Sequence, residues 1–339
     1  MFDKLMNNYY FGKSGKGDFT EDDLPTNRWQ LFMQMLRVRF SALVRLNLMN
    51  VVVWLPLILV LMFSSMSALQ TIQYLDTDGS GVVQYVTRQE DGTEVVNEEQ
   101  ALPTEVVRDR LQGILAITLM LMVPCIAITG PVTAGVSYVT RNWARDEHAF
   151  IWSDFKDAVK ANWKQSLAVS AITSVIPLVV YYCWIFYGDL AETQVIMVLP
   201  QVLILMLGIV WMLAVTYMHP MIVSYQLRLR DVLRNSLLLA VARLPFSVGI
   251  RLLHCMPMVL GVLIAVVFNV PQYVVMALFL YYVLIGYALS RFVSASYTNG
   301  VFEKYINSRI EGAPVNKGLR VSEEDEDDEE DEEEDEDDE

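Results

Sequence analysis

Residues 193–227 read TQVIMVLPQVLILMLGIVWMLAVTYMHPMIVSYQL, and no Asp, Glu, Lys or Arg interrupts them. An α-helix needs about 20 residues to cross the hydrocarbon core of a bilayer. A charged side chain at the centre of such a helix costs about 2.5–3.5 kcal/mol on insertion scales. A charge-free stretch of this length is therefore typical of a membrane-spanning helix and rare in soluble domains.

Four more charge-free windows occur, at 46–75, 111–140, 165–188 and 252–290. The last is too long for one crossing and is interrupted by Asn269-Val270-Pro271-Gln272, which predicts two helices joined by a tight turn. Arg251 lies in the first turns of the fifth span, where a long side chain can reach the interface. We therefore predict an all-α polytopic membrane helix bundle with six transmembrane helices, at about 47–69, 111–136, 166–187, 195–218, 247–268 and 273–293.

The formal net charge of the 339 residues is −15, but this acidity is confined to one segment. The run Glu323–Glu339 is entirely acidic. The rest of the chain holds the other 23 of the 40 acidic residues and all 25 basic residues, so its charge is nearly balanced. No broad basic face is indicated, which argues against nucleic acid as a partner. The three cysteines, Cys125, Cys183 and Cys255, lie in apolar stretches, which excludes a secreted disulfide scaffold.

The basic residues alternate between the two sides of the predicted spans. Of the 25, 22 belong to the N-terminal segment, the second and fourth connections and the C-terminal segment, with Arg251 and Arg291 counted at the adjoining span ends. The other side has Arg88, Arg108 and Arg110. This positive-inside pattern predicts a multi-pass membrane protein with both termini cytoplasmic. A cleaved signal peptide explains the first span less well, because 45 mostly polar residues precede it.

The chain divides into four predicted regions. Residues 1–27 are a flexible cytoplasmic leader, whose glycines lack the spacing of a phosphate-binding loop. Residues 28–45 are an interfacial amphipathic helix, because arginines flank one apolar face formed by Trp29, Phe32, Met33, Leu36 and Phe40. Residues 46–310 form the membrane domain. Residues 311–339 are a disordered acidic tail, because like charges repel and no apolar surface offsets the ordering entropy.

The predicted outer loop 76–110 has two β-rich runs around Asp91-Gly92, which predict a small extracellular β-hairpin. Asp76, Asp78 and Ser80 match the first positions of a calcium loop. The twelfth position is Thr87, where that loop requires a bidentate Glu. We favour a polar turn over a calcium site and predict no metal.

The two predicted inner loops, 141–165 and 226–246, carry aromatic and basic residues. Trp152, Phe155, Val159 and Trp163 recur at spacings of three and four, which predicts a helix along the headgroup boundary. We favour a structural anchor over a partner-docking face for this helix. A short similarity between the two loops is compatible with a parallel duplication of hairpins or with chance.

Catalytic constellations do not stand out in the sequence. His219 and His254 lie near predicted inner ends of spans, where we expect the imidazoles to reach water. We find no metal-ligand spacing, nucleophile elbow or paired buried carboxylates, so we predict no enzyme activity and no cofactor. Prolines in the spans and small residues around Gly130 suit close packing, although kinked helices also form substrate sites in transporters.

Several mostly hydrophobic stretches with a few polar anchors stand out: Gly130-Pro131 through Tyr138, Arg141 through Asp154-Phe155-Lys156, Asn162-Trp163-Lys164-Gln165, Asn235 through Ala240, and Arg243-Leu-Pro245. These stretches resemble the YesL-like family of bacterial membrane proteins, which implies a location in a bacterial plasma membrane. The likeness covers about residues 30–300 and implies an integral membrane protein of uncharacterised activity in a family often associated with carbohydrate uptake. It supplies no catalytic residue, and the long outer hairpin and acidic tail depart from the family's compact pattern.

Together these features favour a non-enzymatic accessory or regulatory membrane protein in contact with the lipid bilayer, whose partner is a carbohydrate transporter or another membrane protein. The alternative is a small-solute transporter or channel that uses proline-kinked helices.

Overall fold

The computed structural model describes residues 24–76, 81–88, 94–268, 270–310, 312–313 and 315–320. Six helical segments in this part are long and apolar enough to cross a membrane, at Arg28–Gln73, Thr104–Ala144, Ser153–Thr193, Val195–Ser224, Leu244–Phe268 and Tyr273–Arg309. The predicted all-α fold with six spans is confirmed, and the chain is a multi-pass membrane protein. The leader up to residue 23 and the acidic run from residue 321 lie outside the described residues.

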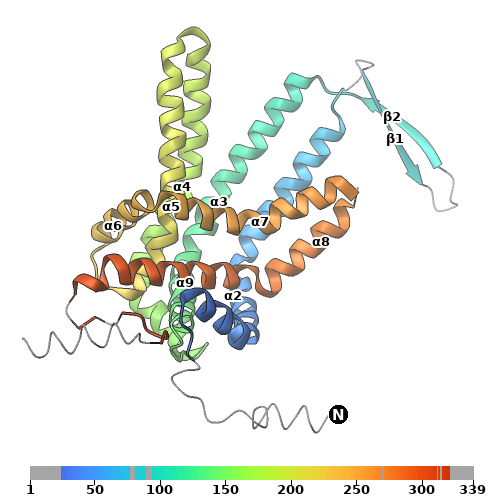
Figure 1. The fold of residues 1–339 in the computed structure, drawn as a ribbon. Coiled ribbons are helices and arrows are strands. Elements are labelled where there is room, and N and C mark those ends of the chain that lie inside the picture. Colours follow the sequence, from blue (N-terminus) through green and yellow to red (C-terminus); the bar gives the residue numbers. More distant parts are fainter. Residues whose placement is uncertain are drawn as a thin grey trace, which may run out of the picture.

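Three helices are much longer than a bilayer is thick. These are α2 (Arg28–Gln73), α3 (Thr104–Ala144) and α4 (Ser153–Thr193), with 46, 41 and 41 residues. At about 1.5 Å per residue they extend for about 60–70 Å, whereas the hydrocarbon core is about 30 Å thick. Each helix is therefore longer than one crossing requires. Figure 1 shows these three long helices.

We had expected residues 28–45 to form a separate interfacial helix. They instead continue directly into the first span as part of α2. Leu31, Met35 and Leu43 on this segment are buried against α3 and α9 (Tyr287–Tyr305). Of the predicted apolar face, Phe32 and Leu36 pack partly against this core, whereas Trp29, Met33 and Phe40 are exposed. Likewise the helix predicted within 141–165 is the first part of α4, and only residues 145–152 connect it to α3.

A two-stranded antiparallel sheet joins α2 to α3, as predicted. Strands β1 (Val82–Arg88) and β2 (Glu94–Gln100) pair from Val82 opposite Gln100 to Arg88 opposite Glu94. The Gln84 side chain donates a hydrogen bond to Glu98 across the strands at 2.8 Å. The expected Asp91-Gly92 turn and the candidate calcium ligands Asp78 and Ser80 lie outside the described residues.

The fourth and fifth spans are joined by a short helix. After η2 (Val195–Met197), α5 (Val198–Ser224) returns toward the start of α4, and α6 (Leu229–Ala242) leads into α7 (Leu244–Phe268). Helix α7 ends at Phe268 and α8 (Pro271–Tyr281) begins at Pro271, which confirms the predicted pair of helices.

A π-helical turn, η3 (Tyr282–Gly286), connects α8 to α9, and a buried asparagine of α2 stabilises it. A π-turn disrupts the i→i−4 ladder of the helix. Asn47 Nδ2 donates to the carbonyls of Tyr282 and Val283 at 2.9 and 2.7 Å, and its Oδ1 accepts from the Ala288 amide at 2.8 Å. One side chain thus satisfies three backbone groups and holds α9 against α2.

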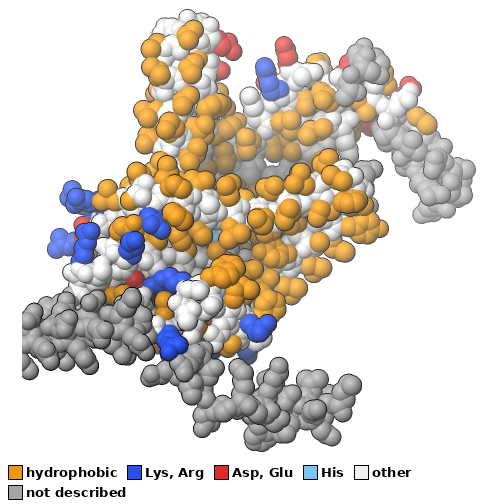
Figure 2. Space-filling model, in the orientation of Figure 1, with side chains coloured by type: hydrophobic (Ala, Val, Ile, Leu, Met, Phe, Trp, Pro, Cys, Tyr) orange, Lys and Arg blue, Asp and Glu red, His pale blue; other side chains and the backbone are white. Residues whose placement is uncertain are grey.

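The buried core lies at one end of the molecule, which we call the basic end. It is the end where α2 and α4 begin and where α3, α5 and α9 finish, and Arg28, Arg141, Arg145 and Lys304 lie there. One of its apolar clusters joins α2, α3 and α9. The other joins α4, α5, α6 and α9. Toward the other end, the hairpins α2–α3, α4–α5 and α7–α8 point in different directions (Figure 1). Hydrophobic side chains cover them (Figure 2).

The most extensive contact between two elements joins α3 to α4 near the basic end. Two glycines of α3 permit it. A Cβ at Gly130 would lie 2.8 Å from the Ser166 carbonyl carbon, and a Cβ at Gly135 would lie 2.5 Å from Phe155 Cδ2. Small residues at such positions let helix backbones approach closely, which strengthens the dispersion contacts between them. These contacts matter in lipid because the hydrophobic effect gives little attraction between helices there.

We therefore expect Gly130→Ala to destabilise the protein by about 1–3 kcal/mol, because the new methyl group must displace the α4 backbone. Thermal unfolding of the purified protein in mild detergent measures this. The matched control is Gly113→Ala on the same helix, where a Cβ would meet nothing within 4 Å, and we expect no loss of stability. Equal losses in both variants would contradict the packing argument.

The orientation of the chain stays a prediction. A single cysteine introduced at exposed Glu98 in the hairpin should react with an impermeant maleimide in intact cells, after the three native cysteines are replaced. A cysteine at exposed Ser308, at the basic end, should react only after the cells are opened, because the positive-inside rule places this end in the cytoplasm. The reverse labelling pattern would show the opposite orientation.

Candidate functional site

The residues highlighted by the sequence do not converge on one site. Gly130, Pro131 and Tyr138 lie on α3, where Gly130 is buried at the α4 contact and the other two are half-buried. Phe155 on α4 is half-buried and packs against Gly135. These residues make the α3–α4 contact or flank it, and Phe155 contributes to packing.

Trp152, at the N-cap of α4, and Trp163, within α4, face outward. Trp152 is 66% exposed and Trp163 is 46% exposed, with Lys164 Nζ 5.6 Å from the Trp163 ring. Asn162 uses its amide within the helix, where Nδ2 donates to the Ala158 carbonyl at 3.0 Å. This exposed aromatic surface suits a membrane interface or a partner, as the sequence predicts.

The two remaining candidates lie around α6. Asn235 is half-buried on α6. Arg243, at the end of α6, donates from Nη1 to the Tyr305 hydroxyl at 3.4 Å, and its guanidinium lies 4.3 Å from the Phe246 ring centroid. Arg243 therefore ties α6 and α7 to the end of α9.

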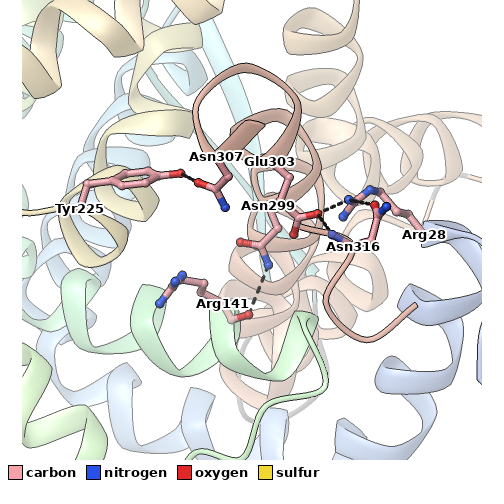
Figure 3. Close-up of polar contacts among 7 residues, drawn as sticks. All are labelled: Arg28, Arg141, Tyr225, Asn299, Glu303, Asn307 and Asn316. Atoms are coloured by element: carbon pink, nitrogen blue, oxygen red, sulfur yellow. Dashed lines mark hydrogen bonds and ion pairs between the residues drawn. The ribbon is translucent and has the colours of Figure 1, made fainter. Parts of the chain in front are cut away.

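A polar cavity at the basic end brings together residues that the sequence analysis did not connect (Figure 3). Its volume is about 260 Å³. The ends of α3, α5 and α9 and the turn η4 (Asn307–Arg309) form its walls. Its polar lining consists of Arg141, Arg145, Ser224, Tyr225, Asn299, Glu303 and Asn307.

Hydrogen bonds between distant segments define this cavity. The Tyr225 hydroxyl donates to Asn307 Oδ1 at 2.6 Å, and Asn299 Nδ2 donates to the Arg141 carbonyl at 3.3 Å. Burial raises the pKa of the Tyr225 phenol to about 12, with Arg141 and Arg145 acting in the opposite direction, so the phenol is protonated at neutral pH. The three helix ends are thus held by neutral donors and acceptors.

Two charged side chains of the cavity are almost fully buried. Glu303 is 3% exposed, and its Oε2 forms an ion pair with Arg28 and accepts from the Asn316 amide at 3.0 Å. Its Oε1 has no partner among the described residues. Arg145 is 6% exposed, and within the described part of the chain its Nε and Nη2 also have no acceptor.

The segment after α9 folds back over this region. Ile310 and Ala313 line the cavity, and Lys317 forms an ion pair with Glu147 at 2.5 Å. The Arg320 amide donates to the Pro25 carbonyl at 3.0 Å, and Leu319 packs on the core. These contacts fix one wall of the cavity to the beginning and middle of the chain.

We had expected both histidines to reach water, but His219 is buried and His254 is half-buried. His219 is 3% exposed on α5, with Nε2 3.4 Å from Ser170 Oγ, because the helices pack most tightly at this end. His254 is half-buried, with Nε2 3.1 Å from the Ser290 carbonyl oxygen. Among the described residues, no group of three His, Cys, Asp or Glu could hold a metal ion.

The fold and its cavity define a multi-pass membrane protein with a polar site at its basic end. Residues 113–184 match the family described as "Protein of unknown function, DUF624". This region covers most of α3 and most of α4, including Gly130 through Trp163 of the highlighted residues. The match is consistent with the resemblance to YesL-like proteins. No curated protein and no solved structure matches the chain.

We expect Arg28→Ala to destabilise the protein by about 2 kcal/mol, because it leaves the Glu303 carboxylate buried without its cation. This is less than for a fully buried pair, since Arg28 is 38% exposed. Thermal unfolding in detergent measures the loss. Arg37→Ala, at an exposed position of the same helix, is the control and should have little effect. Adding Glu303→Gln to Arg28→Ala should restore part of the stability, and a further loss would contradict this account.

Proposed function

We propose that the chain is a non-enzymatic accessory or regulatory membrane protein that packs beside another membrane protein. The observation that carries this proposal is the separation of its three hairpins. The α3–α4 contact joins the α2–α3 and α4–α5 hairpins near the basic end, whereas α7 has few contacts with α5 and α6. Beyond the α3–α4 contact the three hairpins point in different directions (Figure 1). The apolar flanks of the hairpins are therefore exposed to the membrane.

The exposed flanks include large side chains on both helices of the α4–α5 hairpin. Phe186 is 59% exposed, Leu199 is 66% exposed and Leu203 is 57% exposed. Lipid can cover such surfaces, but the helices of another protein can also pack between the hairpins. Helices that pack closely make more dispersion contacts with one another than with fluid lipid. The exposed Trp152 and Trp163 extend this surface toward the basic end.

The resemblance to YesL-like proteins directs the proposal toward carbohydrate uptake, with a carbohydrate transporter as the partner. The transporter alternative has less support. Substrate sites of transporters use discontinuous helices near the middle of the membrane. Here six prolines lie inside continuous helices, at Pro56, Pro124, Pro131, Pro177, Pro220 and Pro257. The arginine-containing cavity lies at the basic end.

A photo-crosslinking amino acid at Phe186 or Leu199 should capture a subunit of a sugar transporter in intact cells, because we expect these flanks to contact its helices. Mass spectrometry of the product identifies the partner. The control position is Leu43, which is fully buried and should give no intermolecular product. Adducts with lipid alone, or with a second copy of this chain alone, at both positions would contradict the accessory role.

A further inference from the structure

The polar cavity at the basic end has the charge and the unsatisfied groups of a solute site. Its volume of about 260 Å³ is far larger than the 10–15 Å³ or so that one water molecule needs on this kind of measure. Arg145 and Glu303 each contribute buried atoms that lack a hydrogen-bond partner among the described residues. Such groups are rare in folded proteins because leaving them unpaired costs about 1–3 kcal/mol or more.

The cavity carries a surplus of positive charge. The Glu303 carboxylate is paired with Arg28, and the nearby Glu147 carboxylate is paired with Lys317. These pairs are neutral overall, so Arg141 and Arg145 remain as two positive charges on the same wall. Guanidinium groups bind phosphate and carboxylate oxygens through charge-assisted and often bidentate hydrogen bonds. The surplus therefore favours a small anion.

A structural role for the two arginines explains less of this arrangement. Arginine near a helix C-terminus can neutralise the negative end of the helix dipole and donate to the last carbonyls. Arg145 caps α3, but within the described chain its Nε and Nη2 donate to no carbonyl. The dipoles of α3 and α5 do weaken the positive potential, so we expect moderate affinity.

The unpaired oxygen of Glu303 defines the ligand further. Glu303 lines a cavity whose other charges attract anions, and its Oε1, which has no partner among the described residues, can only accept hydrogen bonds while the carboxylate is ionised. A suitable ligand therefore combines an anionic group for Arg141 and Arg145 with a hydroxyl that donates to Glu303. We propose that this cavity binds a small phosphate monoester that carries hydroxyl groups.

The proposal does not depend on a partner protein, so it can be tested separately from the accessory function. Titration calorimetry of the full-length protein in mild detergent should detect binding of glycerol 3-phosphate. Arg145→Gln should weaken binding at least about tenfold, as expected for the loss of charge-assisted hydrogen bonds. Arg234→Gln, which removes an exposed arginine of α6, is the control and should change affinity less than twofold. Equal affinity in both variants, or no binding to the folded protein, would overturn the proposal.

A second comparison needs no variant. Monohydrogen phosphate retains a hydroxyl that can donate to Glu303, whereas sulfate has none. We expect phosphate to bind at least about tenfold more tightly than sulfate, by analogy with sites that reject ligands lacking a required hydrogen-bonding group. Glu303→Gln should remove this preference, because the amide can donate to either anion. Equal binding of sulfate and phosphate to the unaltered protein would overturn the role of Glu303.

A phosphate group could also come from a lipid headgroup, and a short-chain phosphatidic acid distinguishes the two sources. If the cavity takes a soluble ester, dioctanoyl phosphatidic acid should not displace glycerol 3-phosphate at equal concentration. Displacement that Arg145→Gln abolishes would assign the site to a lipid and overturn the soluble ligand.

Discussion

The close approach of α3 and α4 at Gly130 and Gly135 is the contact on which the rest of the structure depends. Helices in lipid gain little from the hydrophobic effect, so they associate where small residues allow their backbones to approach. This contact brings the end of α3 beside the start of α4. It also positions the connection that carries Arg145, against which α5 and α9 then pack.

The spans could be predicted from the sequence because a bilayer imposes a simple rule on charge and length. The windows without charge correspond to α2, α3, α4, α5 and α7–α9. The same rule says little about what happens beyond the membrane. The pattern at residues 28–45 identifies an apolar face, of which Trp29, Met33 and Phe40 are exposed. It does not show that the segment continues into the first span, or that Leu31, Met35 and Leu43 are buried against the core.

The cavity could not be predicted because its residues come from positions far apart in the chain. Arg141 and Arg145 are separated from Tyr225 by about 80 residues, and Asn299 and Glu303 lie still further along. None of them forms a local motif, and Glu303 resembles any charged residue after the last span. Asn47 is similar, because its role depends on the π-turn at Tyr282–Gly286, which no sequence period identifies. Polar residues that join distant segments become visible only when the fold is known.

The two proposed activities lie at opposite ends of the same helices. The basic end is well packed, and its polar groups join α3, α5, α9 and the segment after α9 (Figure 3). Toward the other end the hairpins point in different directions (Figure 1). An anion between Arg141 and Arg145 would reduce the repulsion between two guanidinium groups at the end of α3 and would add contacts to α9. Helix α5 ends beside the cavity, next to Tyr225, and its other end forms the exposed α4–α5 flank, so one helix contributes to both proposed sites.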